Sequence, residues 1–398
     1  MVRGTVVGSH VSYEDLQQEM SPEYKGLKYL AVAQEIVGDR NTLHINFNLD
    51  LDFSFSSFSS AAIASQKLFQ GIPAFPDNVP IAPVCTVSLF SLRSGDEGTA
   101  KNLLSACQEL GFFLLDLRGD VLGESLIDDI DQLFDATKDI MSLPQDVKKK
   151  YLHDIPRSFL GFKPRGHAKT ETDEPDRFEW FNMGQDGLMG NTPLQPLPPL
   201  AHTHLPLLTS FLKHGQDVVA TICSTLATQL GLPPDAFTSL QAPTKPSGTV
   251  IRLLKAFSSP ALADLRTSMI HHTDFGTVTL LANVLGGLQI LAPGCTPADD
   301  GDGAWLWVRP QPGCVIVNLG DAMVQWTGGL LRSAVHRVNH APGLQRFEDR
   351  YSFALLVRPE RDAPMRRLVG EDADTDGEDA GLTAWEWEVK KHRKMLGV

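Results

Sequence analysis

Two histidines and an aspartate lie close together in the run "MIHHTDFGTVTLL", residues 269–281. Imidazole nitrogens and carboxylate oxygens are both ligands of transition metals. The surrounding residues are apolar and rich in threonine, which is typical of a β-strand. Residues two apart on a strand project to the same face, so His272 and Asp274 would point together and His271 would point to the opposite face. The strand interpretation therefore selects His272, and not His271, as a metal ligand.

A further histidine is available downstream. His336 lies in "SAVHRVNH", a short run with the character of a strand. Two histidines and one carboxylate make the facial triad that holds non-haem Fe(II) and leaves three coordination positions open. A His-x-Asp pair by itself occurs by chance and is more often a surface feature, so the metal interpretation depends on the wider sequence.

The wider sequence resembles a known enzyme family. "WVRPQPGCVIVNLGDAMVQWTGGLLRSAVHRV", followed by "RYSF", is similar to the isopenicillin N synthase-like group of Fe(II)/2-oxoglutarate-dependent dioxygenases. Upstream blocks such as "LLSACQELGFFLL", "FLGFKPRG" and "DRFEWFNM" occur in the family's order. The resemblance implies Fe(II), 2-oxoglutarate and O2 as cofactors and co-substrates. It also implies an iron site formed by His272, Asp274 and His336, and a site for the far carboxylate of 2-oxoglutarate formed by Arg350 and Ser352.

Physical chemistry supports the role that the resemblance gives to Arg350. Arg350 and Ser352 are two residues apart on a predicted strand, so they share a face. A planar guanidinium binds a carboxylate through two parallel hydrogen bonds, and the serine hydroxyl adds a third donor. The alternative is a surface arginine after "RFED". The apolar strand "YSFALLV" favours a buried arginine, which requires an anion.

One position departs from the family pattern. Many relatives have a tyrosine in a stretch like "RLLHYPP", and its hydroxyl contacts 2-oxoglutarate. The corresponding text here is "RLLKAFSSP", with Ala256 at the position of the tyrosine and Lys255 just before it. Either another donor replaces the hydroxyl or the co-substrate site is altered. We expect substrate contacts from Lys255, from Phe275 and from the region 155–190.

The elements that position these residues follow from periodicity. Beyond Pro246, short runs rich in Val, Ile and Leu recur with Gly, Pro and Asp between them, which indicates a β-sandwich or jelly-roll barrel. Upstream, apolar residues at helical spacing predict helices that end at Gly111, before Pro144 and at Gly231. The predicted fold is α+β with a mainly β core: a double-stranded β-helix (jelly-roll) barrel with an N-terminal helical region and flanking helices.

We expect four segments along the chain. Residues 1–80 form an atypical, partly disordered extension, in which the alternating "INFNLDLDFSFSSF" predicts a strand and the Ser-rich run after it a linker. Residues 81–245 form the helical and mixed region of the oxygenase. Residues 246–360 form the jelly-roll domain for Fe(II) and 2-oxoglutarate. Residues 361–398 hold an acidic loop and a C-terminal helix.

Composition limits the partners and the compartment. The net charge of −13 and the absence of a basic stripe argue against nucleic acid as a partner. The five cysteines have no CxxC spacing and are odd in number, which fits a reducing compartment. No signal peptide pattern and no membrane-spanning run is evident in the sequence. We expect a cytoplasmic protein, monomeric or weakly homo-oligomeric, with a small-molecule substrate.

The resemblance implies a dioxygenase that hydroxylates, desaturates or modifies a ring in a small organic molecule. Specialised-metabolite biosynthesis is the expected context, with succinate and CO2 as co-products. Two alternatives stay open. An Fe(II) oxidase of the same fold would need no 2-oxoglutarate, and Arg350 and Ser352 would then hold the substrate's own carboxylate; Ala256 favours this alternative. A non-catalytic barrel would bind a small molecule without converting it.

Overall fold

The computed structural model describes residues 5–7, 35–39, 42–46, 67–155, 158–170, 172–298, 303–370 and 379–396. The chain divides into two compact units, residues 1–57 and 58–398. In the first unit, the strands β1 (Thr5–Val7), β3 (Thr42–Asn46) and β2 (Glu35–Asp39) pair in that order, all antiparallel. The rest of the strand predicted from Ile45 onward, and the predicted Ser-rich linker, lie outside the described residues.

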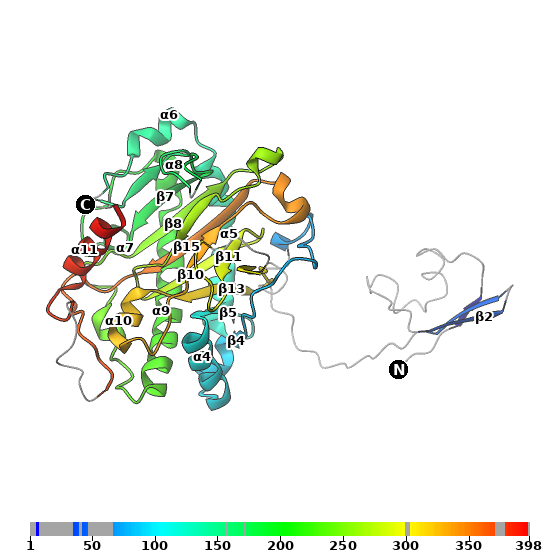
Figure 1. Ribbon diagram of the computed structural model, residues 1–398, viewed down its shortest axis with the longest axis horizontal. Helices are drawn as coiled ribbons and strands as arrows, with labels where there is room; N and C mark the ends of the chain where they lie inside the picture. The colour runs from blue at the N-terminus through cyan, green and yellow to red at the C-terminus, as the bar shows by residue number, and fades with distance from the viewer. Residues whose placement is uncertain are drawn as a thin grey trace. The chain divides into compact units, whose positions relative to one another are not determined.

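Two sheets form the centre of the second unit (Figure 1). The large sheet has the strand order β4 (Thr86–Ser88), β5 (Phe112–Asp116), β13 (Cys314–Leu319), β10 (Val278–Asn283), β15 (Arg350–Val357), β8 (Val250–Ala256), β7 (Phe178–Gly184) and β6 (Gly161–Lys163). The small sheet has the order β12 (Trp305–Trp307), β11 (Leu288–Leu291), β14 (His336–Val338) and β9 (Met269–His272). The runs rich in Val, Ile and Leu beyond Pro246 all form strands, from β8 to β15.

Alternation along the strands gives the large sheet two different faces. On β15, Phe353, Leu355 and Val357 belong to the main hydrophobic core. Arg350 and Ser352 have the opposite parity and therefore project to the other face. The sheet consequently turns an apolar face to the helices and a partly polar face to the small sheet.

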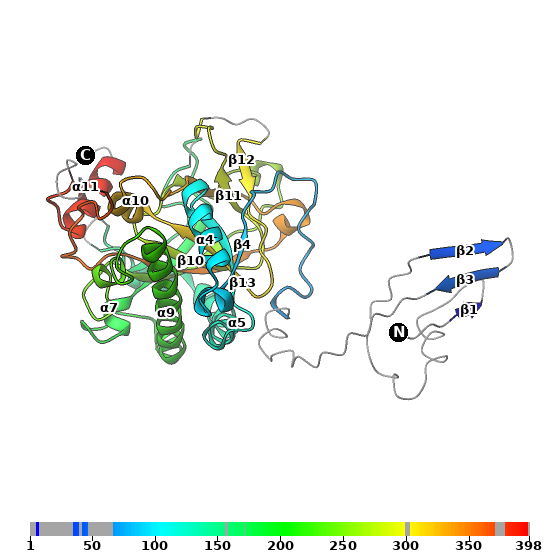
Figure 2. The same cartoon turned by 90° about the horizontal axis from the view of Figure 1, so that it is seen from below.

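The apolar face is covered by three long helices that lie side by side (Figure 2). They are α4 (Glu97–Glu109), α5 (Val121–Met141) and α9 (Leu205–Gln229), at the positions that the apolar periodicity predicts. The side chain of Asp120 accepts hydrogen bonds from the backbone of Leu122 and Gly123 and so caps α5. Gly111, with a φ of +71°, provides the left-handed turn between α4 and β5.

The remaining helices are short, except for the C-terminal one. They are α3 (Leu89–Arg93), α6 (Gln145–Lys148), α7 (Gln185–Leu188), α8 (Pro199–Thr203), α10 (Asp321–Thr327) and α11 (Ala384–Leu396), with 3₁₀ turns η1 (Lys149–Tyr151), η2 (Thr238–Leu240), η3 (Leu262–Asp264) and η4 (Gly343–Phe347). The helix α11 forms where the sequence predicts it. No helix in the described ranges is both long and apolar enough to span a membrane.

Apolar side chains join the polar face of the large sheet to the small sheet. Phe112 and Ile316 pack against Ile290 in one buried cluster, and Ala256 packs with Met269 in another. The two sheets therefore face each other, as in the predicted sandwich or jelly roll.

Several elements were not predicted from the sequence, among them β6, β7 and α10. The strands β6 and β7 lie within the Gly- and Pro-rich passage from 155 to 200, where turn residues obscure short strands. The helix α10 has only seven residues and ends at Gly328, whose φ is +60°. A helix of two turns carries too little periodicity to stand out in a sequence.

Candidate metal centre and co-substrate site

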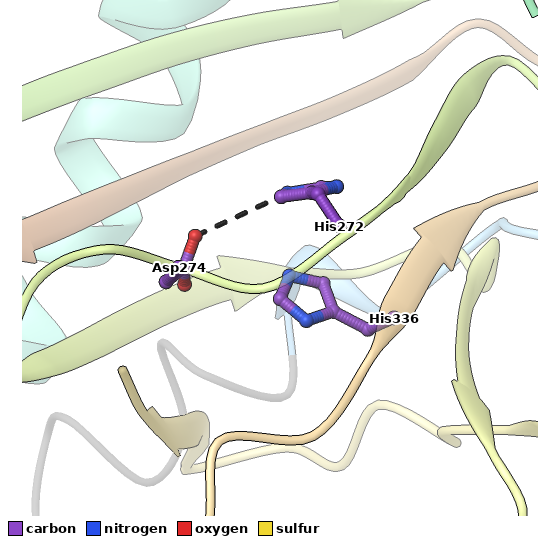
Figure 3. Close-up of side chains that lie close together, drawn as sticks. All are labelled: His272, Asp274 and His336. Carbon is purple, nitrogen blue, oxygen red and sulfur yellow. Dashed lines mark ion pairs between the residues drawn. The ribbon is translucent and has the colours of Figure 1, made fainter. Parts of the chain in front are cut away.

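The two histidines selected from the sequence lie opposite each other in the small sheet. His336 on β14 pairs with His272 on β9 in antiparallel register, and their ring centroids are 4.4 Å apart. Residues directly opposite each other on neighbouring strands project to the same face of the sheet. Figure 3 shows the two rings close together with Asp274 beside them.

Both imidazoles are oriented in the same way. Nδ1 of His272 lies 2.9 Å from the carbonyl oxygen of Ile270, and Nδ1 of His336 lies 3.0 Å from that of Ala334. A carbonyl oxygen can only accept, so Nδ1 carries the proton in each ring. Nε2 of each histidine then carries a lone pair that is available to a metal.

Asp274 reaches the histidines from a loop. The sequence predicted that Asp274 lies on the same strand as His272. The strand β9 ends at His272, however, and Asp274 lies in the loop beyond it. Its Oδ2 accepts hydrogen bonds of 2.8 Å from the hydroxyl of Thr279 on β10 and the amide of Asn318 on β13. Its Oδ1 lies 4.0 Å from Nε2 of His272. One carboxylate oxygen is thus held by the large sheet and the other is presented to the histidines.

The backbone around Asp274 is fixed as well. The amide of Asp321, at the start of α10, donates a 2.7 Å hydrogen bond to the Asp274 carbonyl. Gly320 permits this contact, because a Cβ there would lie 2.2 Å from the Gly276 carbonyl oxygen. The loop that carries the carboxylate is therefore positioned by α10.

The three side chains form the one group of potential metal ligands found in the described part of the chain. Their ligand atoms all lie within 4.8 Å of one another. The side chains of His272 and Asp274 keep 28% and 12% of their accessible surface. Two imidazole nitrogens and one carboxylate oxygen this close together fit a facial site for Fe(II).

Electrostatics keeps the candidate ligands in their metal-binding forms. Burial and the neighbouring His336 lower the pKa of His272 to about 4. Burial tends to raise the pKa of Asp274, but His336, His272 and the bonds from Asn318 and Thr279 lower it to about 2. At neutral pH His272 is neutral and Asp274 is ionised, which are the forms that bind a metal.

Arg350 is a buried cation on the face of the large sheet that also carries Thr279 and Asn318. Only 3% of its surface is exposed, and one terminal nitrogen donates a 2.9 Å hydrogen bond to the Ser352 hydroxyl. Its Nε is buried with no hydrogen-bond partner in the described residues, and burial lowers its pKa to about 10. No carboxylate in those residues pairs with it. The site therefore fits a ligand that brings its own carboxylate.

A glycine makes room for this guanidinium. A Cβ at Gly287 would lie 3.1 Å from Cδ and 3.2 Å from Nε of Arg350, and the φ of Gly287 is +132°. Ala256 lies directly opposite Arg350 in the β8–β15 register and is 4% exposed. The position expected to carry a tyrosine hydroxyl thus contributes only a methyl group to this site.

Two further residues lie outside the cluster: His271, which strand alternation excludes as a ligand, and Lys255, from which we expected substrate contact. His271 turns toward Trp305, with ring centroids 6.3 Å apart. Lys255 has the opposite parity to Ala256 on β8 and pairs with Asp349 at 2.8 Å.

Phe275 follows Asp274 directly. Its ring packs against His392 of α11, with centroids 4.6 Å apart. Phe275 therefore lies next to the candidate metal ligands and against the C-terminal helix.

Sequence reasoning missed the polar side chains that support the cluster. Asn318 and Thr279 hold Asp274, and Arg252 lies on the same face of the large sheet as Arg350. A signal was present, because each is a polar residue within an otherwise apolar strand, in "VIVNLG", "TVTLLA" and "TVIRLLKAF". Such residues are costly to bury unless a partner satisfies them.

Comparison with known proteins identifies the family. Family models match residues 252–359, as the 2OG-Fe(II) oxygenase superfamily, and residues 82–198, as the N-terminal region of the "non-haem dioxygenase in morphine synthesis". A 2-oxoglutarate-dependent dioxygenase of Aspergillus fumigatus is 30% identical over 337 residues, covering 80% of this chain and 86% of the relative. The chain belongs to the 2OG-Fe(II) oxygenase superfamily. This 2OG-Fe(II) oxygenase is therefore a dioxygenase that uses Fe(II), 2-oxoglutarate and O2.

Solved structures of 2OG-Fe(II) oxygenases share the fold. A putative family member from Caulobacter crescentus aligns with a TM-score of 0.65 at 25% identity, over 79% of this chain and 99% of that chain. A full-length Neurospora crassa protein in complex with alpha-KG aligns with a TM-score of 0.63 at 21% identity, over 81% of this chain and 99% of that chain. The predicted jelly-roll fold is confirmed, and membership of the superfamily disfavours both the oxidase and the non-catalytic barrel.

Proposed function

We propose that His272, Asp274 and His336 bind the Fe(II) of this 2OG-Fe(II) oxygenase, and that Arg350 and Ser352 bind the far carboxylate of 2-oxoglutarate. One observation carries the proposal. A cluster with the donor set of a facial iron site, its ligand atoms within 4.8 Å of one another, faces the same interior as a buried arginine without a carboxylate partner in the described residues.

In this proposal the protein's own residues hold the metal and orient the co-substrate. The hydrogen bonds at Nδ1 of His272 and His336 direct Nε2 of each ring to the metal, and the large sheet holds Asp274 so that Oδ1 is the ligand atom. Arg350 fixes the far end of the co-substrate and so sets its direction. Bound Fe(II) and 2-oxoglutarate would supply the electrons that activate O2, the oxidant, with release of succinate and CO2.

The substrate in this proposal is a small organic molecule, which is hydroxylated, desaturated or modified in a ring during specialised-metabolite biosynthesis. The similarity to a 2-oxoglutarate-dependent dioxygenase of Aspergillus fumigatus supports an oxidation as the reaction. Phe275, which follows the ligand Asp274 and packs on α11, is our candidate for contact with the substrate. The net charge of −13 supports a small molecule over a nucleic acid.

An anaerobic titration tests the proposed site. Fe(II) and then 2-oxoglutarate are added to the purified protein, and the visible charge-transfer absorption of the iron-bound 2-oxo acid is recorded. We expect saturation near one equivalent of each, loss of the absorption in His272→Ala, and a weaker 2-oxoglutarate affinity in Arg350→Ala. Native-like absorption in His272→Ala would assign the metal to another site.

A further inference from the structure

A second arginine lies on the same face of the large sheet as Arg350. Arg252 shares a face of β8 with Ala256, and its Nε donates a 2.9 Å hydrogen bond to the side-chain oxygen of Asn182 on β7. The guanidinium carbon lies 3.9 Å from the centre of the Trp180 ring. These contacts fix the plane of the guanidinium and leave both terminal nitrogens without a hydrogen-bond partner in the described residues.

Charge compensation distinguishes Arg252 from its basic neighbours. Lys163 forms a 2.6 Å ion pair with Asp176, and Arg358 forms a 2.8 Å ion pair with Glu388. Arg252 has no carboxylate within ion-pair distance in the described ranges, and its hydrogen-bond partner is a neutral amide. A partly buried guanidinium of this kind favours an anionic ligand.

Further polar atoms next to Arg252 have no partner. Nε1 of Trp180 is buried without an acceptor in the described residues, and both ring nitrogens of His153, whose ring centroid is 6.4 Å from that of Trp180, are buried and unpartnered in the same residues. Most buried polar groups in proteins are hydrogen-bonded. Nε1 of Trp180 and the one N–H of a neutral His153 are unsatisfied donors near the guanidinium, and they fit a ligand that brings acceptor oxygens.

Compared with Arg350, Arg252 lies nearer to the end of the large sheet at which Thr279 holds Asp274. It pairs with Ala354 on β15, four positions beyond Arg350, which is roughly 13 Å along a strand. Thr279, which holds Asp274, pairs with β15 two positions further on. Arg350 and Arg252 thus offer two separate positions for anions.

We propose that Arg252 and Trp180 bind a carboxylate of the substrate, so that the enzyme acts on small carboxylic acids; this rests on the proposed function. Formal charges support the assignment. The Fe(II) dication and the guanidinium groups of Arg350 and Arg252 outweigh the Asp274 carboxylate by three charges. The doubly negative 2-oxoglutarate leaves one positive charge, which a monoanionic substrate cancels. An interior with balanced charge avoids the cost of an uncompensated buried cation.

Anaerobic calorimetry on the protein loaded with Fe(II) and 2-oxoglutarate tests the inference. The probes are hexanoate, benzoate and phenylacetate, each compared with its primary amide, which removes the charge and keeps the shape. We expect at least one acid to bind ten times more tightly than its amide, and Arg252→Gln to abolish that preference. Arg252→Lys keeps part of it, and Trp180→Phe, which removes the Nε1 donor, reduces it.

A surface variant controls for the loss of a positive charge elsewhere. Arg118 pairs with Asp116 at the end of β5 and is half-exposed, so Arg118→Gln should leave the acid preference unchanged. Circular dichroism and the unfolding midpoint confirm that each variant is folded. If Arg252→Gln does not fold, Arg252→Lys and Trp180→Phe carry the test.

The remaining outcomes contradict either the inference about Arg252 or the proposed function, and the experiment separates the two. Equal binding of acids and amides, or a preference that persists in Arg252→Gln, overturns the inference. A tenfold loss of 2-oxoglutarate affinity in Arg252→Gln overturns it too, because Arg252 would then bind the co-substrate. Failure of the native Fe(II) protein to bind 2-oxoglutarate refutes the proposed function instead, and this is measured first.

Discussion

His272 and His336 lie opposite each other on neighbouring antiparallel strands, and each donates its Nδ1 proton to the carbonyl oxygen two residues before it in the chain. The two rings are therefore oriented by the backbone of the small sheet, whereas Asp274 is oriented by side chains of the large sheet. The candidate metal centre joins the two sheets, and its geometry depends on how they pack.

The first prediction concerns the ligands. His272→Ala and Asp274→Ala should each lower Fe(II) affinity by well over about 100-fold, because each removes a direct ligand, a larger change than the loss of a supporting bond. His271→Ala should keep most of the affinity, since His271 turns toward Trp305. Anaerobic Fe(II) titration measures all three. An equal loss in the three variants would contradict the assignment of ligands.

A second prediction concerns the support of Asp274. Asn318→Ala should lower Fe(II) affinity by about 10- to 100-fold, because the carboxylate loses one of the bonds that orient it. Thr279→Val should act in the same direction, and Thr279→Ser, which keeps the hydroxyl, should restore the affinity. The unfolding midpoint is measured in parallel. If the Fe(II) affinity falls together with the unfolding midpoint, and Thr279→Ser does not restore it, then Asn318 and Thr279 have a purely structural role.

The third prediction concerns the co-substrate. Arg350→Ala should raise the Kd of 2-oxoglutarate about 30-fold or more, since the loss of a buried charge-assisted pair costs at least about 2 kcal/mol. Fe(II) affinity without 2-oxoglutarate should stay near that of the native protein. An unchanged Kd would show that Arg350 does not bind 2-oxoglutarate.

Glycine variants refine this test. Gly287→Ala crowds the Arg350 guanidinium and should also raise the Kd of 2-oxoglutarate. Gly294→Ala is the matched control, because Gly294 has a φ of +86° with no atom near its Cβ position. Both variants carry backbone strain, but only the first crowds the arginine. Equal effects of the two on the Kd would show that strain, and not the position of Arg350, is responsible.

The fourth prediction concerns pH. The folded metal-free protein holds the pKa of His272 near 4, below the usual 6.5, so between these values the unfolded chain binds a proton that the folded protein does not. Stability should therefore fall as the pH drops from about 6.5 to 4, and less steeply in His272→Gln. Urea midpoints across this range measure the slopes. A native slope in His272→Gln would refute the prediction.

Strand periodicity predicted much of the fold and selected His272 over His271, because alternation is a local property. The same rule, applied to "TVIRLLKAF", places Arg252 with Ala256 and turns Lys255 to the helix side, so the substrate contact expected from Lys255 agrees neither with this rule nor with the structure. The bond from Asn318 to Asp274 could not be predicted in this way. It joins residues 44 positions apart, and it depends on how separate strands come together.

The central claim is that this cluster binds Fe(II) and uses 2-oxoglutarate as the reductant for O2. Succinate formed per O2 consumed tests it most directly, in a reaction with Fe(II) and 2-oxoglutarate and with Asp274→Ala as the inactive control. The account predicts equal amounts of succinate and O2, and neither reaction in the variant. Consumption of O2 without succinate, or succinate formation that persists in Asp274→Ala, would contradict it.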